Sequence, residues 1–72
     1  MGNPSMIRPL TPRQRQILEL LAIGWDSVDI AEELKISVQT VKNHKLDIYR
    51  QVGSHNLAET FYLLGWLKVP NS

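Results

Sequence analysis

The stretch that decides the fold is residues 26–53, DSVDIAEELKISVQTVKNHKLDIYRQVG. Asp26 is a favourable N-cap, and apolar residues then recur at helical spacing as far as Leu34. Ser37 is the N-cap of a longer helix that we expect to end at Gly53, a residue type that tolerates the left-handed backbone of a helix C-terminus. Only two residues remain for the connection. Such a short turn makes the two helices cross at a large angle and holds the second against the first.

The longer helix has an apolar face and a polar face. At about 100° per residue, Val41, Ile48 and Val52 fall within about 40° of one another, and we predict that this stripe faces the core. His44 and Lys45 border the stripe. The opposite face mixes amides, cations and one apolar residue. Its members are Gln39, Lys42, Asn43, Leu46 and Arg50.

This polar face has the chemistry that reads base edges in the major groove of DNA. Asn and Gln side chains can bond adenine bidentately, Lys can donate to guanine, and Leu can contact a thymine methyl. A polar face alone is ordinary for an amphipathic helix, and it is the preceding helix and the tight turn that favour DNA binding. We therefore predict that the base-reading residues are Gln39, Lys42, Asn43 and Leu46.

Residues along most of the chain match one known sequence pattern. They are Leu10-Thr11-Pro12-Arg13, Ile17-Leu18, Gly24, Ile30-Ala31, Leu34, Ser37, Thr40-Val41-Lys42, His44, Ile48 and Gly53. In these residues, over positions 10–64, the chain resembles the LuxR-type, or GerE-like, helix-turn-helix domains of transcription regulators. A bare helix-turn-helix pattern recurs by chance, whereas the string Thr-Val-Lys-Asn-His shortly after a Ser N-cap is more specific. The resemblance implies an all-α fold of four helices, with the third in the major groove and the fourth used for dimerisation.

The chain departs from the family pattern at four positions. Family members usually carry Glu at the position of Gln14 and basic residues at those of Val28 and Gln51. They often carry Arg at the position of Leu57. The valine removes a phosphate contact from the helix before the turn, so other residues must supply the contacts to the DNA backbone. We expect these contacts from Arg13, Arg15, Thr40, Lys45 and Arg50. The alternative for the first two is a pair of solvated cations.

A first helix over residues 11–23 and a fourth over residues 57–64 complete the predicted fold. Thr11 and Asn56 are their N-caps, and Gly24 ends the first helix. The fourth helix is apolar nearly all round. Three of its residues are expected to cover the core: Ala58, Phe61 and Leu64. Five apolar residues in and after this helix then lack a surface within so small a chain: Leu57, Tyr62, Leu63, Trp66 and Leu67.

A second copy of the chain would cover this apolar patch. An exposed patch of that size is typical of an interface, and a symmetric pair would place two reading helices about 34 Å apart on a two-fold DNA site. We therefore predict a homodimer. The alternative is that residues 66–70 fold back and bury part of the patch.

Charge is unevenly distributed along the chain. The 72 residues have a net charge of only +1. Residues 26–34 contain four carboxylates and no cation, whereas residues 37–50 contain three cations and one carboxylate. The low total predicts modest non-specific affinity for DNA and a shallow dependence on salt. We therefore expect partner proteins to matter for its binding to DNA.

Composition argues against several other functions. The chain has no cysteine, and its two histidines, His44 and His55, lie on different predicted elements, so a metal site is not expected. No residue cluster pairs a nucleophile with a base, and so small a core leaves no room for a cofactor, so we expect neither an enzyme nor a cofactor-binding protein. No apolar run approaches the roughly 20 residues of a membrane helix. We expect a cytoplasmic protein.

The sequence divides into a flexible arm at residues 1–8, the helix-turn-helix domain at 9–67 and a tail at 68–72. It is expected to be a stand-alone regulator, unless it is an excised domain whose residues 1–5 were added in cloning. Two functions are consistent with the pattern. The first is a sequence-specific, DNA-binding transcription regulator. The second is a protein-interaction module that uses the helix-turn-helix frame to bind RNA polymerase or another regulator.

Overall fold

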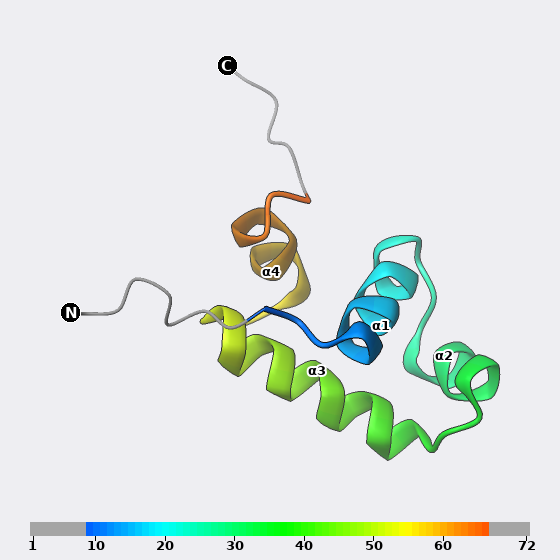
Figure 1. The fold of residues 1–72 in the computed structure, drawn as a ribbon. Coiled ribbons are helices and arrows are strands. Elements are labelled where there is room, and N and C mark those ends of the chain that lie inside the picture. Colours follow the sequence, from blue (N-terminus) through cyan, green and yellow to red (C-terminus); the bar gives the residue numbers. More distant parts are fainter. Residues whose placement is uncertain (1–8, 67–72) are drawn as a thin grey trace.

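The computed structural model describes residues 9–66, and within them it contains four α-helices and no strand (Figure 1). The helices are α1 (Pro12–Ala22), α2 (Ser27–Leu34), α3 (Val38–Val52) and α4 (Leu57–Leu63). The prediction of an all-α, four-helix fold is confirmed. The predicted arm at residues 1–8, the tail at 68–72 and Leu67 lie outside the described residues.

Each helix begins at a side chain that accepts a hydrogen bond from the backbone N–H three residues later. These N-caps are Thr11, Asp26, Ser37 and Asn56. At α1 the cap is reciprocal, because the Thr11 N–H also donates to Gln14 Oε1 at 3.0 Å. A cap of this kind contributes about 1 kcal/mol to stability, which matters in a small domain. The four helix starts were all predicted from the sequence.

The turn between α2 and α3 is closed by a left-handed residue. Lys35 has a φ of 58°, and it is the one non-glycine residue with positive φ in the described part of the chain. This conformation lets the Ile36 N–H donate to the Ala31 carbonyl at 3.0 Å, and Ser37 then caps α3 at once. The two-residue turn predicted from the sequence is confirmed. At the far end of α3, Gly53 has a φ of 81° and ends the helix as expected.

The core lies where the other three helices meet α3. In Figure 1, α2 packs at the start of α3, α1 lies over its middle and α4 lies over its end. Among the described residues the buried apolar ones are Ile17, Leu18, Leu21, Ile30, Ala31, Val41, Ile48 and Val52. Trp25 is partly buried and packs against this cluster. Full burial of each large aliphatic side chain contributes about 1.5–3 kcal/mol.

The inward face of α4 differs from the prediction. Leu57, Phe61 and Leu64 pack against the core at helical spacing, whereas Ala58 is exposed. The prediction that Ala58 covers the core was wrong, because the centre of the inward face is the fully buried polar residue Thr60. A prediction from apolar residues alone therefore chose the wrong inward face for α4.

Trp66 also finds a surface within the chain. The backbone N–H of Trp66 donates to the backbone carbonyl of Phe61 at 2.8 Å, and the two rings stack with their centroids 5.9 Å apart. Gly65, with a φ of 78°, permits this return of the chain. The argument that Leu57 and Trp66 lack a surface was therefore wrong, while Tyr62 and Leu63 remain exposed.

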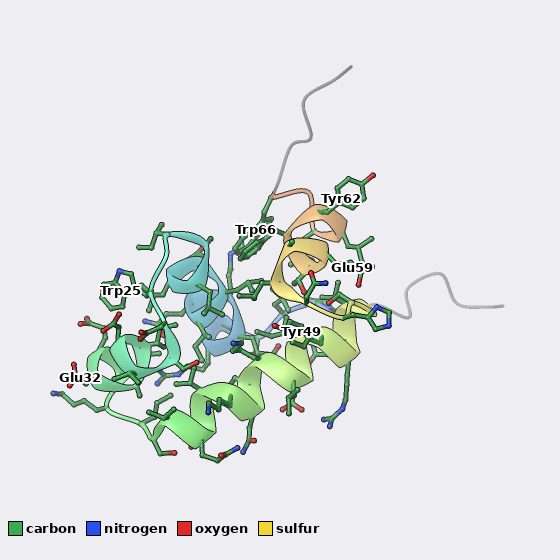
Figure 2. The ribbon with its side chains drawn as sticks, turned by 180° about the vertical axis from the view of Figure 1, so that it is seen from behind. Trp25, Glu32, Tyr49, Glu59, Tyr62 and Trp66 are labelled. Atoms are coloured by element: carbon green, nitrogen blue, oxygen red, sulfur yellow. The ribbon has the colours of Figure 1, made fainter. Side chains whose placement is uncertain are left out.

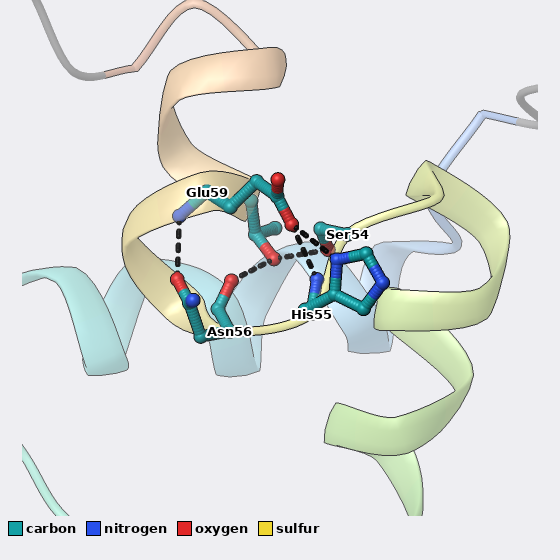
Figure 3. A network of polar contacts seen from close by, with 5 residues as sticks. Ser54, His55, Asn56 and Glu59 are labelled. Atoms are coloured by element: carbon teal, nitrogen blue, oxygen red, sulfur yellow. Dashed lines mark hydrogen bonds and ion pairs between the residues drawn. The ribbon is translucent and has the colours of Figure 1, made fainter.

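A polar network holds α4 to the end of α3 (Figure 3). The Thr60 hydroxyl donates to the Asn56 carbonyl at 2.8 Å and lies 2.6 Å from the buried Ser54 hydroxyl. Because the Thr60 proton goes to the carbonyl, Ser54 is the donor in the second bond. The network satisfies two buried hydroxyls at the junction of the two helices.

Replacing Thr60 with Val should lower the free energy of unfolding by about 1–3 kcal/mol, because the shape is kept while Ser54 loses its buried acceptor. Urea denaturation followed by circular dichroism measures the effect. Thr60→Ser is the matched variant, since it keeps the hydroxyl and removes only a methyl group. A Thr60→Val protein as stable as the original would show that the network adds nothing.

Glu59 accepts two hydrogen bonds from His55, one from its backbone N–H at 2.6 Å and one from Nδ1 at 2.9 Å. The backbone bond, followed by the side-chain bond, lowers the pKa of the Glu59 carboxyl. A carboxyl whose pKa is depressed by folding stabilises the fold above its unfolded pKa, and this contribution is lost as the pH falls through the folded value.

His55→Ala should raise the pKa of Glu59 only part of the way to its ordinary value, because the backbone N–H remains as a donor. A carbon-13 NMR titration of the Glu59 carboxyl measures this change. Full return to the ordinary pKa would show that the imidazole, and not the backbone, sets the shift.

Candidate nucleic-acid interface

Helix α3 presents the row that the sequence analysis singled out. Val41, Ile48 and Val52 are buried on one side of the helix. The residues exposed on the other side are Gln39, Lys42, Asn43, Leu46 and Arg50. The predicted division into two faces is confirmed, and no other described element covers the row. That these residues read DNA stays a prediction.

Three polar side chains of the row, those of Gln39, Asn43 and Arg50, bond to neighbours on their own helix. Gln39 Nε2 donates to Asn43 Oδ1 at 3.0 Å, and Arg50 forms an ion pair with Asp47 at 2.9 Å. Exposed pairs at these spacings stabilise a helix by only about 0.2–0.5 kcal/mol. The amides and the guanidinium can therefore exchange these bonds for bonds to a ligand at low cost.

The start of α3 brings a hydroxyl pair to the edge of the same face. Ser37 Oγ accepts a hydrogen bond from the Thr40 N–H at 3.0 Å and lies 2.8 Å from Thr40 Oγ1. Thr40 and Lys45 are half-buried, so each is held closer to the body of the domain than the exposed row. Both remain candidates for phosphate contacts.

The two arginines of α1 have different surroundings. Arg13 is exposed near the start of the helix. The Arg15 guanidinium lies over the Trp66 ring, 5.3 Å from its centroid, and forms an ion pair with Glu19 at 3.4 Å. Figure 2 shows Trp66 between α1 and α4. To contact a phosphate, Arg15 would have to give up its contacts with Trp66 and Glu19. For Arg13 the described part of the chain shows no such contact to give up.

Two of the departures from the family pattern are partners of one another. Gln14 Nε2 donates to Gln51 Oε1 at 2.9 Å and so joins α1 to α3. Gln14 is buried, and its oxygen also takes part in the α1 cap. Where the resemblance leads us to expect an acidic and a basic residue, this chain has two neutral amides that satisfy each other. The linked change in charge type was the signal that could have revealed the contact.

The acidic residues gather on α2, at the other side of the turn. An open hollow there is lined by Trp25, Asp29, Glu32 and Glu33. Figure 2 shows Trp25 and Glu32 together at this end of the domain, far from Tyr62 on α4. Val28 on the same helix is 53% exposed. The negative charge of this surface would repel phosphates. It would attract a basic segment of another protein.

One candidate residue was missed by the sequence analysis. Tyr49 lines an open hollow on α3 together with four residues already singled out: Gln39, Lys42, Lys45 and Leu46. Burial raises the pKa of the Tyr49 hydroxyl, so it remains a protonated donor near neutral pH. The signal was present in the spacing, because Lys42, Leu46 and Tyr49 follow one another at intervals of four and three residues and so lie in line along the helix.

Two further observations concern residues 9–66. No helix in this range is both long and apolar enough to cross a membrane. Nor do the described His, Asp and Glu side chains form a group of three that could hold a metal ion.

Comparison with known proteins agrees with this geometry. Residues 8–64 match the GerE family, described as bacterial regulatory proteins of the luxR family. This chain belongs to that family, and its helix-turn-helix is the family's DNA-binding fold. No solved structure matches the sequence significantly.

Two curated relatives illustrate the relationship. The chain is 39% identical over 56 residues to the probable transcriptional regulatory protein SgaR of Hyphomicrobium methylovorum, covering 78% of this chain and 26% of that protein. It is 37% identical over 51 residues to the fimbriae Z protein of Salmonella typhimurium strain LT2, covering 71% of this chain and 24% of that protein. The matched segment thus spans about a quarter of the length of these relatives.

Proposed function

We propose that this chain binds double-stranded DNA and regulates transcription, with α3 lying in the major groove. The observation that carries the proposal is the exposed row of α3, which faces outward because Val41 on the other side is buried in one core with Ile30 and Ala31 of α2. An α-helix fits the major groove, and the row supplies amides, cations and an apolar contact in the types that read base edges. Binding to the chromosome would place the protein in the cytoplasm.

The residues divide into two roles. Base reading is assigned to Gln39, Lys42, Asn43 and Leu46, which are all exposed. Phosphate contacts are assigned to Arg13, Arg15, Thr40, Lys45 and Arg50. Arg15 is the weakest of these assignments, because its guanidinium already contacts Trp66 and Glu19.

An electrophoretic shift assay on random duplexes at low salt tests binding itself. Non-specific contacts become visible at protein concentrations of about 10⁻⁴ M, so no shift there would remove the proposal. A selection of bound sites from a random DNA pool would then give the base preference and the symmetry of the site.

The two roles predict different mutant behaviour on the selected site. Lys42→Ala should cost about 1–3 kcal/mol and relax base preference at one position, because a base contact is lost. Arg13→Ala should weaken binding to all sequences alike and reduce the slope of log affinity against log salt by about 1. Equal losses on all sequences from both variants would contradict the assigned roles.

The exposed face of α4 supports a homodimer. Tyr62 is 57% and Leu63 is 48% exposed, and Figure 2 shows Tyr62 pointing away from the other helices. A second copy packed on these residues would bury both. Of the patch predicted from the sequence, Leu57 and Trp66 contribute only the parts that the core leaves uncovered.

Leu63→Glu should weaken self-association, because it places a charge in the apolar contact. Analytical ultracentrifugation over a range of concentrations measures the change. Val28→Glu is the control, since it puts the same charge on an exposed apolar residue of α2, away from α4. A dimer unaffected by Leu63→Glu, or weakened equally by both changes, would refute this interface.

A second candidate function rests on the acidic hollow of α2. A basic segment of RNA polymerase or of another regulator would find carboxylates at Asp29, Glu32 and Glu33 around an apolar floor at Trp25. If the shift assay shows no DNA binding, this interaction module becomes the better proposal. It is compatible with DNA binding, because the acidic residues lie on α2 and the basic ones on α3.

A further inference from the structure

The hollow on α3 is lined by one apolar side chain, two basic ones, an amide and a phenol. Leu46, which is 49% exposed, lines it together with Lys42 and Lys45, and Gln39 and Tyr49 complete the lining. Its volume is about 340 Å³ and it is open to solvent, so the edge of a larger molecule can enter without any rearrangement of the helix. A single exposed leucine is ordinary in a protein surface. A half-exposed leucine that shares an open hollow with two lysines is a more specific arrangement.

We propose that this hollow receives the 5-methyl group of a pyrimidine in the major groove, so that the protein binds DNA in a way that depends on base methylation. The inference rests on the proposed function and adds to it a named ligand group and a residue that selects it. The ligand group is shared by thymine and 5-methylcytosine, whose methyls project from the same ring carbon. Leu46 is the residue that distinguishes a methylated from an unmethylated base.

The positive charges of the hollow favour DNA as its ligand. Two ammonium groups beside an apolar contact repel cationic ligands and attract a polyanion whose phosphates run on either side of the groove. The Lys42 and Lys45 side chains can reach those phosphates or guanine edges while their aliphatic stems lie against the methyl group. Tyr49 keeps its proton near neutral pH and can donate to a phosphate at the end of the hollow.

The apolar side chain of Leu46 determines what can be read. It has no donor or acceptor, so it cannot distinguish thymine from cytosine by their exocyclic groups. It gains only from removing a methyl group from water. One buried carbon of this kind changes affinity about fourfold, which corresponds to about 0.8 kcal/mol. Thymine and 5-methylcytosine should therefore satisfy this contact equally, and uracil and cytosine should not.

The experiment uses a site selected from the random DNA pool and the full 72-residue chain. Each thymine is replaced in turn by deoxyuridine, a change that removes one methyl and leaves every hydrogen-bonding group in place. Each cytosine is replaced in turn by 5-methylcytosine. We expect about a fourfold loss for deoxyuridine at one position of each half-site. At that position a change to cytosine should weaken binding, and methylation of the cytosine should recover about fourfold.

Leu46→Ala is the decisive variant. It should lose the difference between thymine and deoxyuridine while its affinity keeps the same dependence on salt, because the lysines remain. Val28→Ala is the matched control, since it shortens an exposed apolar side chain on α2 and should keep the full methyl dependence. Circular dichroism establishes that both variants are folded.

Failure of the proposed function and failure of this inference give different results. If the original chain binds no duplex, the proposed function fails and this inference fails with it. If it binds duplexes but no position responds to loss or gain of a methyl, only this inference is overturned. Methyl dependence that persists unchanged in Leu46→Ala overturns it as well, because another residue would then hold the methyl group.

Discussion

The structure depends on the contact that holds α3 against α2. Ile30 and Val41 are fully buried and Ala31 nearly so, and the left-handed backbone of Lys35 brings the two helices together after only two residues. Because this contact fixes the rotation of α3 about its axis, it also fixes which residues face outward. A rotation of α3 by a quarter of a turn would bury part of the row and expose part of the core stripe. Every functional assignment on α3 follows from that orientation.

The chemistry of the surface follows the same division. Carboxylates collect on α2 and cations on α3, so a net charge of +1 conceals two faces of opposite character. On the outward row of α3 the hydrogen-bonded side chains pair only with exposed neighbours, as with Gln39 and Asn43, and these bonds cost little to exchange. The polar contacts that join the helices lie away from this row, as in the buried Ser54–Thr60 pair and the part-buried contact between Gln14 and Gln51. Binding can therefore rearrange the surface without disturbing the frame.

Much of this was predictable because it is local. Local features depend on residues close together in the sequence. They include N-caps such as Thr11, the glycine after α3 and the buried stripe of α3, and the sequence predicted each of them. Non-local contacts were not. The partner of Gln14 lies 37 residues away, and the contact of Arg15 with the Trp66 ring joins the first helix to the residues after the last one. The inward face of α4 was misjudged because a helix of seven residues carries little periodic signal and buries a threonine at its centre.

The central claim is that the outward row of α3 is the surface that meets DNA. The most direct measurement is a map of backbone amide shifts in a nitrogen-15 NMR spectrum as a duplex of the selected sequence is added. The account predicts that the largest changes fall on residues 39–50, with smaller ones near Arg13, and that the amides of Glu32 and Glu33 stay in place. Changes confined to α2 or α4, with the α3 amides unmoved at saturation, would contradict it.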